Sequence, residues 1–204
     1  MSASAGDEID LSMNEIEMTA LKAARGAGLP WSVSEDAGRA TRWLASNGAD
    51  WSDLLLGSLE PAIALDPDAS PFLVGARVAD RLDSLTASEK IGATTFRPIW
   101  LLAMLVVNAP PSRAFVLSIG DDRYSVREGQ VTASVPLVNL AAAEREEMSL
   151  HAGGERFAHV LAPSRTRSTI PVAHHAALET LVYRTYVPNS EKSRLRGAGA
   201  RPGN

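Results

Sequence analysis

The sequence Arg-Gly-Ala-Gly occurs twice in this chain, and its residue types and spacing suit an anion-binding site better than those of any other segment. The two copies occupy residues 25–28 and 196–199. Glycines let successive backbone N–H groups point into one concave surface that accepts an anion, and a neighbouring arginine can add a bidentate hydrogen bond. We therefore predict a site for a carboxylate or a phosphate, with the C-terminal copy folded over the first as a lid. The predicted ligand-binding residues are Arg25, Gly26, Gly28, Trp31, Arg194, Arg196, Gly197 and Gly199.

The first copy also has a simpler, structural interpretation. Gly26 and Gly28 follow a predicted helix, where glycine is the usual C-terminal cap. Trp31 is one of three tryptophans within 21 residues, with Trp43 and Trp51, and such a group suits either an aromatic core or a stacking surface for a ligand. The structural and the ligand-binding interpretations both stay open at this point.

The four histidines do not form a predicted metal or catalytic site. His151 and His159 fall on opposite faces of a predicted hairpin, and His174 and His175 diverge by about 100° on a predicted helix. The sequence contains no nucleophile elbow, phosphate-binding loop or metalloprotease motif. We therefore predict no metal site, and we leave catalytic residues, cofactors and the question of enzyme activity unassigned.

Charge is distributed unevenly along the chain. The 204 residues carry a net charge of −4, which argues against nucleic-acid binding because such domains are usually basic. From Ser164 to Asn204, however, seven Lys or Arg stand against two Glu, a net charge of +5. A basic end on an acidic body suggests docking on the body itself, on a second copy in a homo-oligomer, or on an acidic partner protein.

Composition also bounds the cellular location. There is no cysteine, and the first ten residues lack the basic and apolar regions of a signal peptide. The longest apolar run, residues 99–107, has nine residues, whereas a membrane span needs about 20. We therefore expect a soluble, cytoplasmic protein that does not cross a membrane.

Helix-start signals mark the first sixty residues. Ser12 and Glu15 have the spacing of a capping box, in which each side chain binds an unpaired backbone N–H group at the helix start, and Ser32 and Glu35 repeat that spacing. Asp50 is predicted to cap a third, shorter helix. These signals predict an N-terminal layer of three helices.

The following fifty residues are harder to interpret. Three prolines predict a loop over residues 60–71, and apolar residues at helical spacing predict a helix over residues 74–85. The apolar run 99–107 has the length of a buried strand, which we favour, although periodicity alone does not separate a strand from a helix there.

The middle of the chain has the pattern of a β-meander. Residues 114–119 alternate along a predicted strand, and two tight turns follow. When Glu128-Gly129 is taken as the second turn, Tyr124 lies opposite Ala133 and Val126 opposite Val131. The result is a three-stranded antiparallel sheet with one apolar face.

A further hairpin and a last helix complete the predicted fold. Gly153-Gly154 predicts a two-residue hairpin loop that pairs Leu150 with Phe157, and residues 172–186 predict a helix. The fold class is α+β, with an N-terminal helical layer, a central antiparallel sheet of hairpins, a closing C-terminal helix and a glycine-rich basic tail. The predicted organisation is a disordered leader over residues 1–10, a single domain over 11–187 and a basic tail over 188–204.

Two blocks of sequence give the chain a resemblance to a family. The N-terminal block is Ser12-Met-Asn-Glu-Ile-Glu17, Lys22-Ala-Ala-Arg-Gly-Ala-Gly28, Trp31, Ala37-Gly-Arg-Ala40 and Arg42-Trp-Leu44. The C-terminal block is Arg184-Thr-Tyr-Val-Pro188, Ser190-Glu191, Ser193-Arg194 and Gly197-Ala-Gly-Ala200. Together they resemble an uncharacterised, mainly proteobacterial family of unknown function. The resemblance implies no activity, cofactor or catalytic residue.

Two classes of function follow from these observations. The first is a cytoplasmic protein that binds or acts on a small anionic metabolite through the Arg-Gly-Ala-Gly loops. The second is a non-catalytic accessory subunit that docks on a protein partner, or on its own twin, through the basic C-terminal tail.

Overall fold

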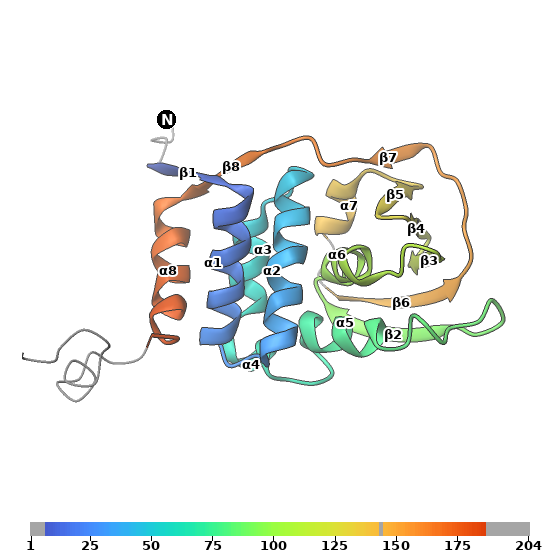
Figure 1. Cartoon of the computed structure of the whole chain (residues 1–204), viewed down its shortest axis with the longest axis horizontal. Helices are drawn as coiled ribbons and strands as arrows, with labels where there is room; N and C mark the ends of the chain where they lie inside the picture. Colours follow the sequence, from blue (N-terminus) through green and yellow to red (C-terminus); the bar gives the residue numbers. More distant parts are fainter. Residues whose placement is uncertain (1–6, 143–144, 187–204) are drawn as a thin grey trace, which may run out of the picture.

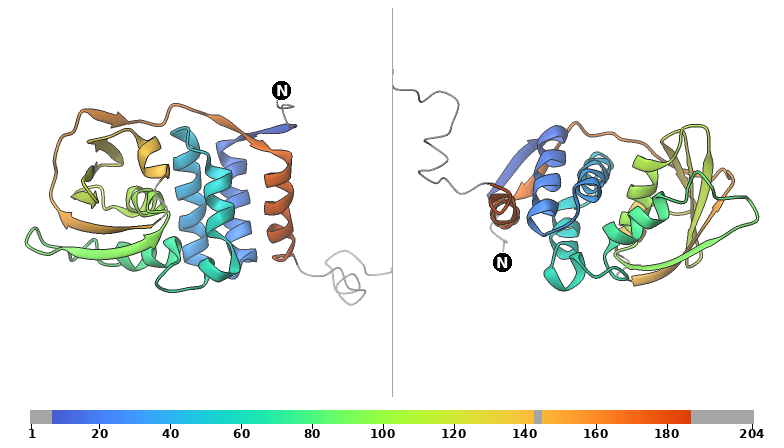
Figure 2. Two further views of the ribbon diagram at one scale, coloured as in Figure 1. Left: turned by 180° about the vertical axis from the view of Figure 1, so that it is seen from behind. Right: turned by 60° about the horizontal axis from the view of Figure 1, so that its bottom comes forward.

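The computed structural model describes residues 7–142 and 145–186, and it confirms the α+β class (Figure 1). Helices stand side by side in one half of the molecule, and a curved sheet wraps around helix α6 (Ile99–Asn108) in the other half (Figures 1 and 2). The chain segment between the last strand of the sheet and the last helix runs along the top of both halves. The fold therefore brings residues 163–171 against the N-terminal helices.

The helical half confirms the predicted N-terminal layer and the closing helix. Its helices are α1 (Met13–Gly26), α2 (Trp31–Ser46), α3 (Trp51–Ser58) and α8 (Val172–Tyr183), with a single turn α4 (Pro61–Ala64) after α3. The Ser12–Glu15 capping box forms as predicted, since each side chain binds the other residue's backbone N–H group. Asp50 caps α3 through the backbone N–H of Asp53.

The predicted start of the second helix is wrong. The helix α2 begins at Trp31 with Pro30 in the capping position, and no side chain caps it. Proline has no N–H group to leave unpaired and its fixed φ suits the entry to a helix. Ser32 therefore lies inside the first turn, where it does not form a capping box with Glu35.

The predicted disordered leader over residues 1–10 is wrong for residues 8–10, which belong to a strand, while residues 1–6 lie outside the described part. Glu8–Ser12 form strand β1, which pairs antiparallel with β8 (Arg167–Pro171). Arg167 Nε donates to Asp10 Oδ2 at 2.5 Å across this pair. The partner strand lies far along the sequence, so no local pattern predicts this ladder.

The second half contains a six-stranded antiparallel sheet in the order β2-β6-β3-β4-β5-β7. Its strands are β2 (Ile91–Phe96), β3 (Ala114–Ile119), β4 (Asp122–Arg127), β5 (Gln130–Ala133), β6 (Arg145–Ala152) and β7 (His159–Leu161), with a short helix α7 (Leu137–Ala142) after β5. The predicted meander is confirmed with its register, because Tyr124 faces Ala133 and Val126 faces Val131. Glu128 and Gly129 both have positive φ, as a type I′ turn requires.

The hairpin predicted at Gly153-Gly154 is wrong. Strand β6 instead lies between β2 and β3, where Leu150 is opposite Ile91 on one side and Leu117 on the other. The chain then crosses the sheet and joins β5 as β7. Because β6 is a central strand, Met148 and Leu150 are buried. This burial determines which strands pair, and it outweighs the local turn signal at Gly153-Gly154.

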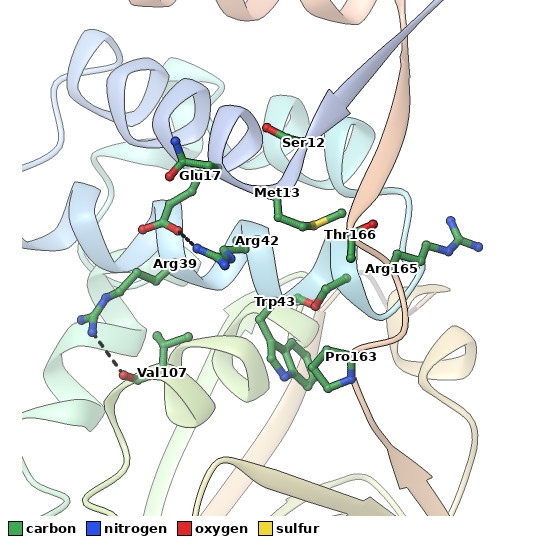
Figure 3. Close-up of a pocket in the computed structure, with 12 residues that line it drawn as sticks. Ser12, Met13, Glu17, Arg39, Arg42, Trp43, Val107, Pro163, Arg165 and Thr166 are labelled. Atoms are coloured by element: carbon green, nitrogen blue, oxygen red, sulfur yellow. Dashed lines mark hydrogen bonds and ion pairs between the residues drawn. The ribbon is translucent and has the colours of Figure 1, made fainter.

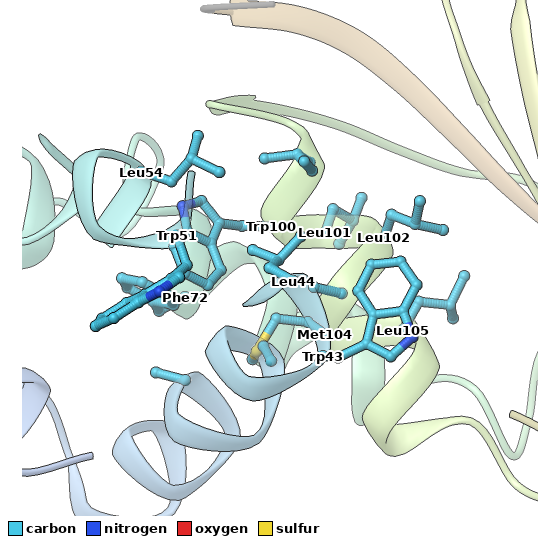
Figure 4. Packing of buried hydrophobic residues seen from close by; sticks show 14 of the residues in the cluster. Trp43, Leu44, Trp51, Leu54, Phe72, Trp100, Leu101, Leu102, Met104 and Leu105 are labelled. Carbon is cyan, nitrogen blue, oxygen red and sulfur yellow. The ribbon is translucent and has the colours of Figure 1, made fainter. Parts of the chain in front are cut away.

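The strand favoured for residues 99–107 is also wrong. Ile99–Asn108 form helix α6, and residues 99–105 are all buried. This helix packs between the sheet and the helices α2 and α5 (Pro71–Ala79) (Figure 4). A helix covered on every side shows no apolar stripe, which is why the sequence pattern does not identify it.

Two smaller boundaries also differ from the prediction. The helix predicted over residues 74–85 runs from Pro71 to Ala79 and is capped by Ser70, while Leu82 and Leu85 are buried from the turns that follow it. The last helix ends at Tyr183. Buried apolar residues of both halves form one continuous core.

Candidate functional site

The predicted anion loop at the end of α1 is held together by its own contacts. The Arg25 guanidinium donates a 2.7 Å hydrogen bond from Nη1 to the carbonyl oxygen of Leu29. It also lies 5.6 Å from the centre of the Trp31 ring, whose side chain is 59% exposed. Arg25 therefore has a structural role in closing the turn between α1 and α2.

The two glycines of this loop also meet structural needs. A Cβ atom on Gly26 would lie 1.8 Å from the carbonyl oxygen of Leu181, so glycine allows α1 and α8 to approach closely. Gly28 has a φ of +101°, the left-handed conformation that ends a helix at low cost. These contacts fit the simpler interpretation of the first Arg-Gly-Ala-Gly copy.

The second copy lies outside the described residues. Arg194, Arg196, Gly197 and Gly199 fall in the range 187–204, of which the structure gives no description. A site that uses both copies therefore stays a prediction.

A groove of about 680 Å³ opens elsewhere on the helical half (Figure 3). It lies between the start of α1, one face of α2, the end of α6 and the segment that leads to β8. It is lined by Ser12, Met13, Asn14, Glu17, Arg39, Arg42, Trp43, Ser46, Val107, Pro163, Arg165 and Thr166. We call this the arginine groove.

Helix α2 supplies the polar wall of the arginine groove. Arg39, Arg42, Trp43 and Ser46 follow each other at the spacing that places side chains on one helix face. The indole of Trp43 points inward and is 8% exposed, whereas the Arg39 and Arg42 side chains are 47% and 52% exposed. The helix thus anchors itself by the tryptophan and presents both cations to solvent.

The opposite wall is fixed by backbone hydrogen bonds. The N–H groups of Ser164 and Arg165 both donate to the carbonyl oxygen of Ser46, at 3.0 and 3.2 Å. The N–H group of Met13 donates to the carbonyl oxygen of Thr166 at 3.2 Å. These bonds hold the segment against the start of α1 and the end of α2, and the groove exists because of that placement.

The arginines of the groove differ in how fully they are engaged. Arg39 binds Asp36 and, at 3.0 Å, the side-chain oxygen of Asn108. Arg42 makes one ion pair, from Nη1 to Glu17 Oε2 at 2.9 Å. The side chain of Arg165 turns away from these two (Figure 3) and lies over Gly48.

Two positive side chains, Arg39 and Arg42, and one negative one, Glu17, belong to the groove, because the third arginine of its lining, Arg165, turns away from them. Guanidinium groups bind carboxylates and phosphates through paired hydrogen bonds. Met13, Trp43, Val107 and Pro163 provide apolar surface beside them. The arrangement suits a ligand that has an anionic group and an apolar part.

One histidine, His174, takes a structural position. His174 Nδ1 lies 2.9 Å from Ser52 Oγ, which also contacts Asp50. Ser52 is only 1% exposed, so this cluster ties α8 to α3 and does not present a nucleophile. Within residues 7–142 and 145–186, no three His, Asp or Glu side chains are grouped as metal ligands.

The same described residues include no helix that is long and apolar enough to span a bilayer. The apolar run that is longest in the sequence is the buried helix α6.

The comparison with known families gives a match over part of the chain. Residues 11–70 match a family model described as "Protein of unknown function (DUF3726)". This supports the resemblance to an uncharacterised family of unknown function over the N-terminal block. No curated protein and no solved structure matches the chain.

Eight of the twelve lining residues of the arginine groove, those from Ser12 to Ser46, lie inside the matched segment. The sequence does contain a signal for Arg39 and Arg42, which share a helix face within the N-terminal block. It contains none for Pro163, Arg165 and Thr166, because their contact with α1 and α2 depends on the pairing of β8 with β1.

Proposed function

We propose that this protein binds a small anionic molecule with an apolar part in the arginine groove. The observation that carries the proposal is the position of Arg42 and Arg39 beside the apolar surface of Met13, Trp43 and Val107 in one groove of ligand size. Ligand pockets commonly combine apolar walls with a few placed polar groups, in volumes of about 300–1,000 Å³.

Arg42 is the group that we expect to contact the anion. Its present partner is Glu17, in a single ion pair in which the arginine is 52% and the carboxylate 24% exposed, and solvent-accessible ion pairs contribute only about 0–1 kcal/mol to stability. An incoming carboxylate or phosphate can therefore replace Glu17 at little cost. Arg39 stays fixed by Asp36 and Asn108 and supplies a second positive charge.

The proposal concerns binding and not a reaction. Among the described residues, the groove contains no histidine, and Glu17 is its single carboxylate. General acid–base chemistry usually needs a positioned group of tuned pKa, or a pair of such groups.

A thermal-shift screen of the purified protein against small carboxylates, phosphates and nucleotides tests the proposal. A ligand at about 100 times its Kd adds roughly 2.7 kcal/mol of stability, which raises the melting temperature. Each hit is then titrated by calorimetry against Arg42→Ala and against Arg127→Ala, an exposed arginine on β4 that serves as the matched control. The proposal predicts loss of binding in the first variant alone; a silent screen, or equal affinity in both variants, contradicts it.

Two alternative functions remain predictions. Binding through the Arg-Gly-Ala-Gly copies and docking through the basic tail both depend on residues after 186, which lie outside the described part. A cytoplasmic location likewise rests on composition.

A further inference from the structure

The outer edge of the six-stranded sheet is formed by β2, which pairs with β6 on one side. At one end of its other side, the N–H group of Phe96 donates to the carbonyl oxygen of Ala69 at 3.2 Å. Backbone groups of alternate residues point to the same side of a strand. The N–H and C=O groups of Gly92 and Thr94 therefore face away from β6, and no other strand of the described part pairs with them.

This edge lacks the usual features that prevent unwanted pairing. Natural edge strands are commonly protected by proline, by lysine, by inward-pointing charges or by a bulge. The strand reads Ile-Gly-Ala-Thr-Thr-Phe, with none of these residues and with an unbroken register against β6. The face of the sheet at Gly92 is also uncovered, since a Cβ atom there would meet nothing within 4 Å.

A second groove, of about 480 Å³, follows this edge between β2 and α5. Val74 and Val78 of α5 form its floor together with Ile91, and Arg77 and Arg81 stand along its rim. The two arginines are 56% and 55% exposed. Their partners are Asp68 at 3.3 Å and Glu89 at 4.0 Å, which are long, exposed contacts of small net value.

We propose that β2 and α5 form a docking site for an extended acidic peptide of a partner protein, which adds to the sheet as a strand beside β2. Main-chain hydrogen bonds to Gly92 and Thr94 would supply affinity, as in other cases of strand addition. An acidic side chain of the peptide would pair with Arg77 or Arg81, and an apolar one would cover the valines.

The length of the site agrees with this occupant. Residues 91–94 line the groove, and four residues of strand span about 13 Å at 3.3 Å per residue. The contact at Phe96 closes one end of the free edge, because Ala69 already occupies it. A peptide of about four to six residues therefore fits beside the open part of β2.

The test uses the full-length protein and a phage-displayed library of random decapeptides. Enriched peptides should contain Asp or Glu within an alternating apolar pattern. Synthetic copies are then measured by fluorescence anisotropy against wild type, Gly92→Pro and the double variant Arg77→Glu/Arg81→Glu. Gly92→Pro removes an outward N–H group without breaking the ladder to β6, and we expect it to weaken binding at least tenfold. We expect the same from the double charge reversal.

Two control variants show whether the peptide binds at this edge and nowhere else. Arg127→Glu, on a strand inside the sheet, and Arg42→Ala, in the arginine groove, should both leave peptide affinity unchanged. Amide hydrogen exchange of the wild-type protein should slow at Gly92 and Thr94 when peptide is added. This measurement does not depend on whether the variants fold.

Three outcomes would overturn the proposal. They are a library without enriched peptides, binding that survives both Gly92→Pro and the charge reversal, and a wild-type dimer that Gly92→Pro converts to a monomer. The last result would show that a second copy of the chain occupies the edge.

Discussion

Two regions of the helical half combine an arginine with a tryptophan, and they differ in what the arginine binds. In the loop after α1, Arg25 binds the carbonyl oxygen of Leu29 and lies 5.6 Å from the ring centre of the exposed Trp31. In the arginine groove, Arg42 binds the half-buried carboxylate of Glu17, and the neighbouring Trp43 is buried. The same two residue types thus close a turn in one place and line an open groove in the other.

The difference lies in the partners that the fold supplies. Arg25 finds a backbone acceptor four residues away along its own chain. The guanidinium of Arg42 stands in a groove whose other wall, residues 163–166, comes from the far end of the described chain. We therefore place the proposed binding site in the arginine groove, where segments distant in sequence surround Arg42, and not at the loop after α1, where the backbone already binds Arg25.

The largest expected loss of stability is at Trp43, and the comparison is with Trp31. Trp43→Ala removes a side chain that is 8% exposed, and such deletions cost about 3–5 kcal/mol of unfolding free energy. Trp31→Ala removes a side chain that is 59% exposed and should cost under about 1 kcal/mol. Urea unfolding of both variants measures the contrast; a cost for Trp31→Ala equal to that of Trp43→Ala would mean that Trp31 is part of a buried surface.

The next largest expected effect is a loss of stability at Gly26, which lies where α1 packs closely against α8. Gly26→Ala forces a Cβ atom against the Leu181 backbone, and overpacking of this kind typically costs about 1–3 kcal/mol. Gly57→Ala is the matched control, because its new Cβ would meet only the movable guanidinium of Arg97. We expect a lower melting temperature for the first variant and little change or a small gain for the second. Equal melting temperatures would remove the structural reason for Gly26.

The smallest effect is a pH dependence at the start of α1. Hydrogen bonds from the Ser12 hydroxyl and the Ser12 backbone N–H lower the pKa of Glu15 below its ordinary value of 4.5. A carboxylate with a lowered folded-state pKa contributes stability above its unfolded pKa, and that contribution is lost as pH falls through the folded value. The stability difference between wild type and Glu15→Gln should therefore shrink as the pH falls below about 4.5. Urea unfolding at several pH values measures it, and a difference independent of pH contradicts the assignment.

Local signals and long-range pairing explain which elements the sequence predicts. The capping box at Ser12 and the turn at Glu128-Gly129 act within a few residues, and both form as predicted. Strand β1 depends on β8, and the position of β6 depends on burial between β2 and β3. Those pairings join segments that no local pattern relates, so the sequence does not predict them.

The arginine groove, too, is predictable from the sequence only in part. Arg39 and Arg42 share a predicted helix face within the matched segment, and that much follows from the spacing. Their environment does not, because the opposite wall of the groove is placed by hydrogen bonds of Ser164 and Arg165 to Ser46. The Arg-Gly-Ala-Gly loop is the more conspicuous feature in sequence, since its residues are adjacent.

The most direct test of the central claim is the affinity of Arg42→Ala and of Arg25→Ala for one anionic ligand identified by the thermal-shift screen. Loss of a charge-assisted hydrogen bond costs about 1.5–3 kcal/mol, or roughly 10- to 150-fold in affinity. The arginine groove predicts that loss for Arg42→Ala and near wild-type affinity for Arg25→Ala. The reverse order would place the ligand at the loop after α1 and contradict the account.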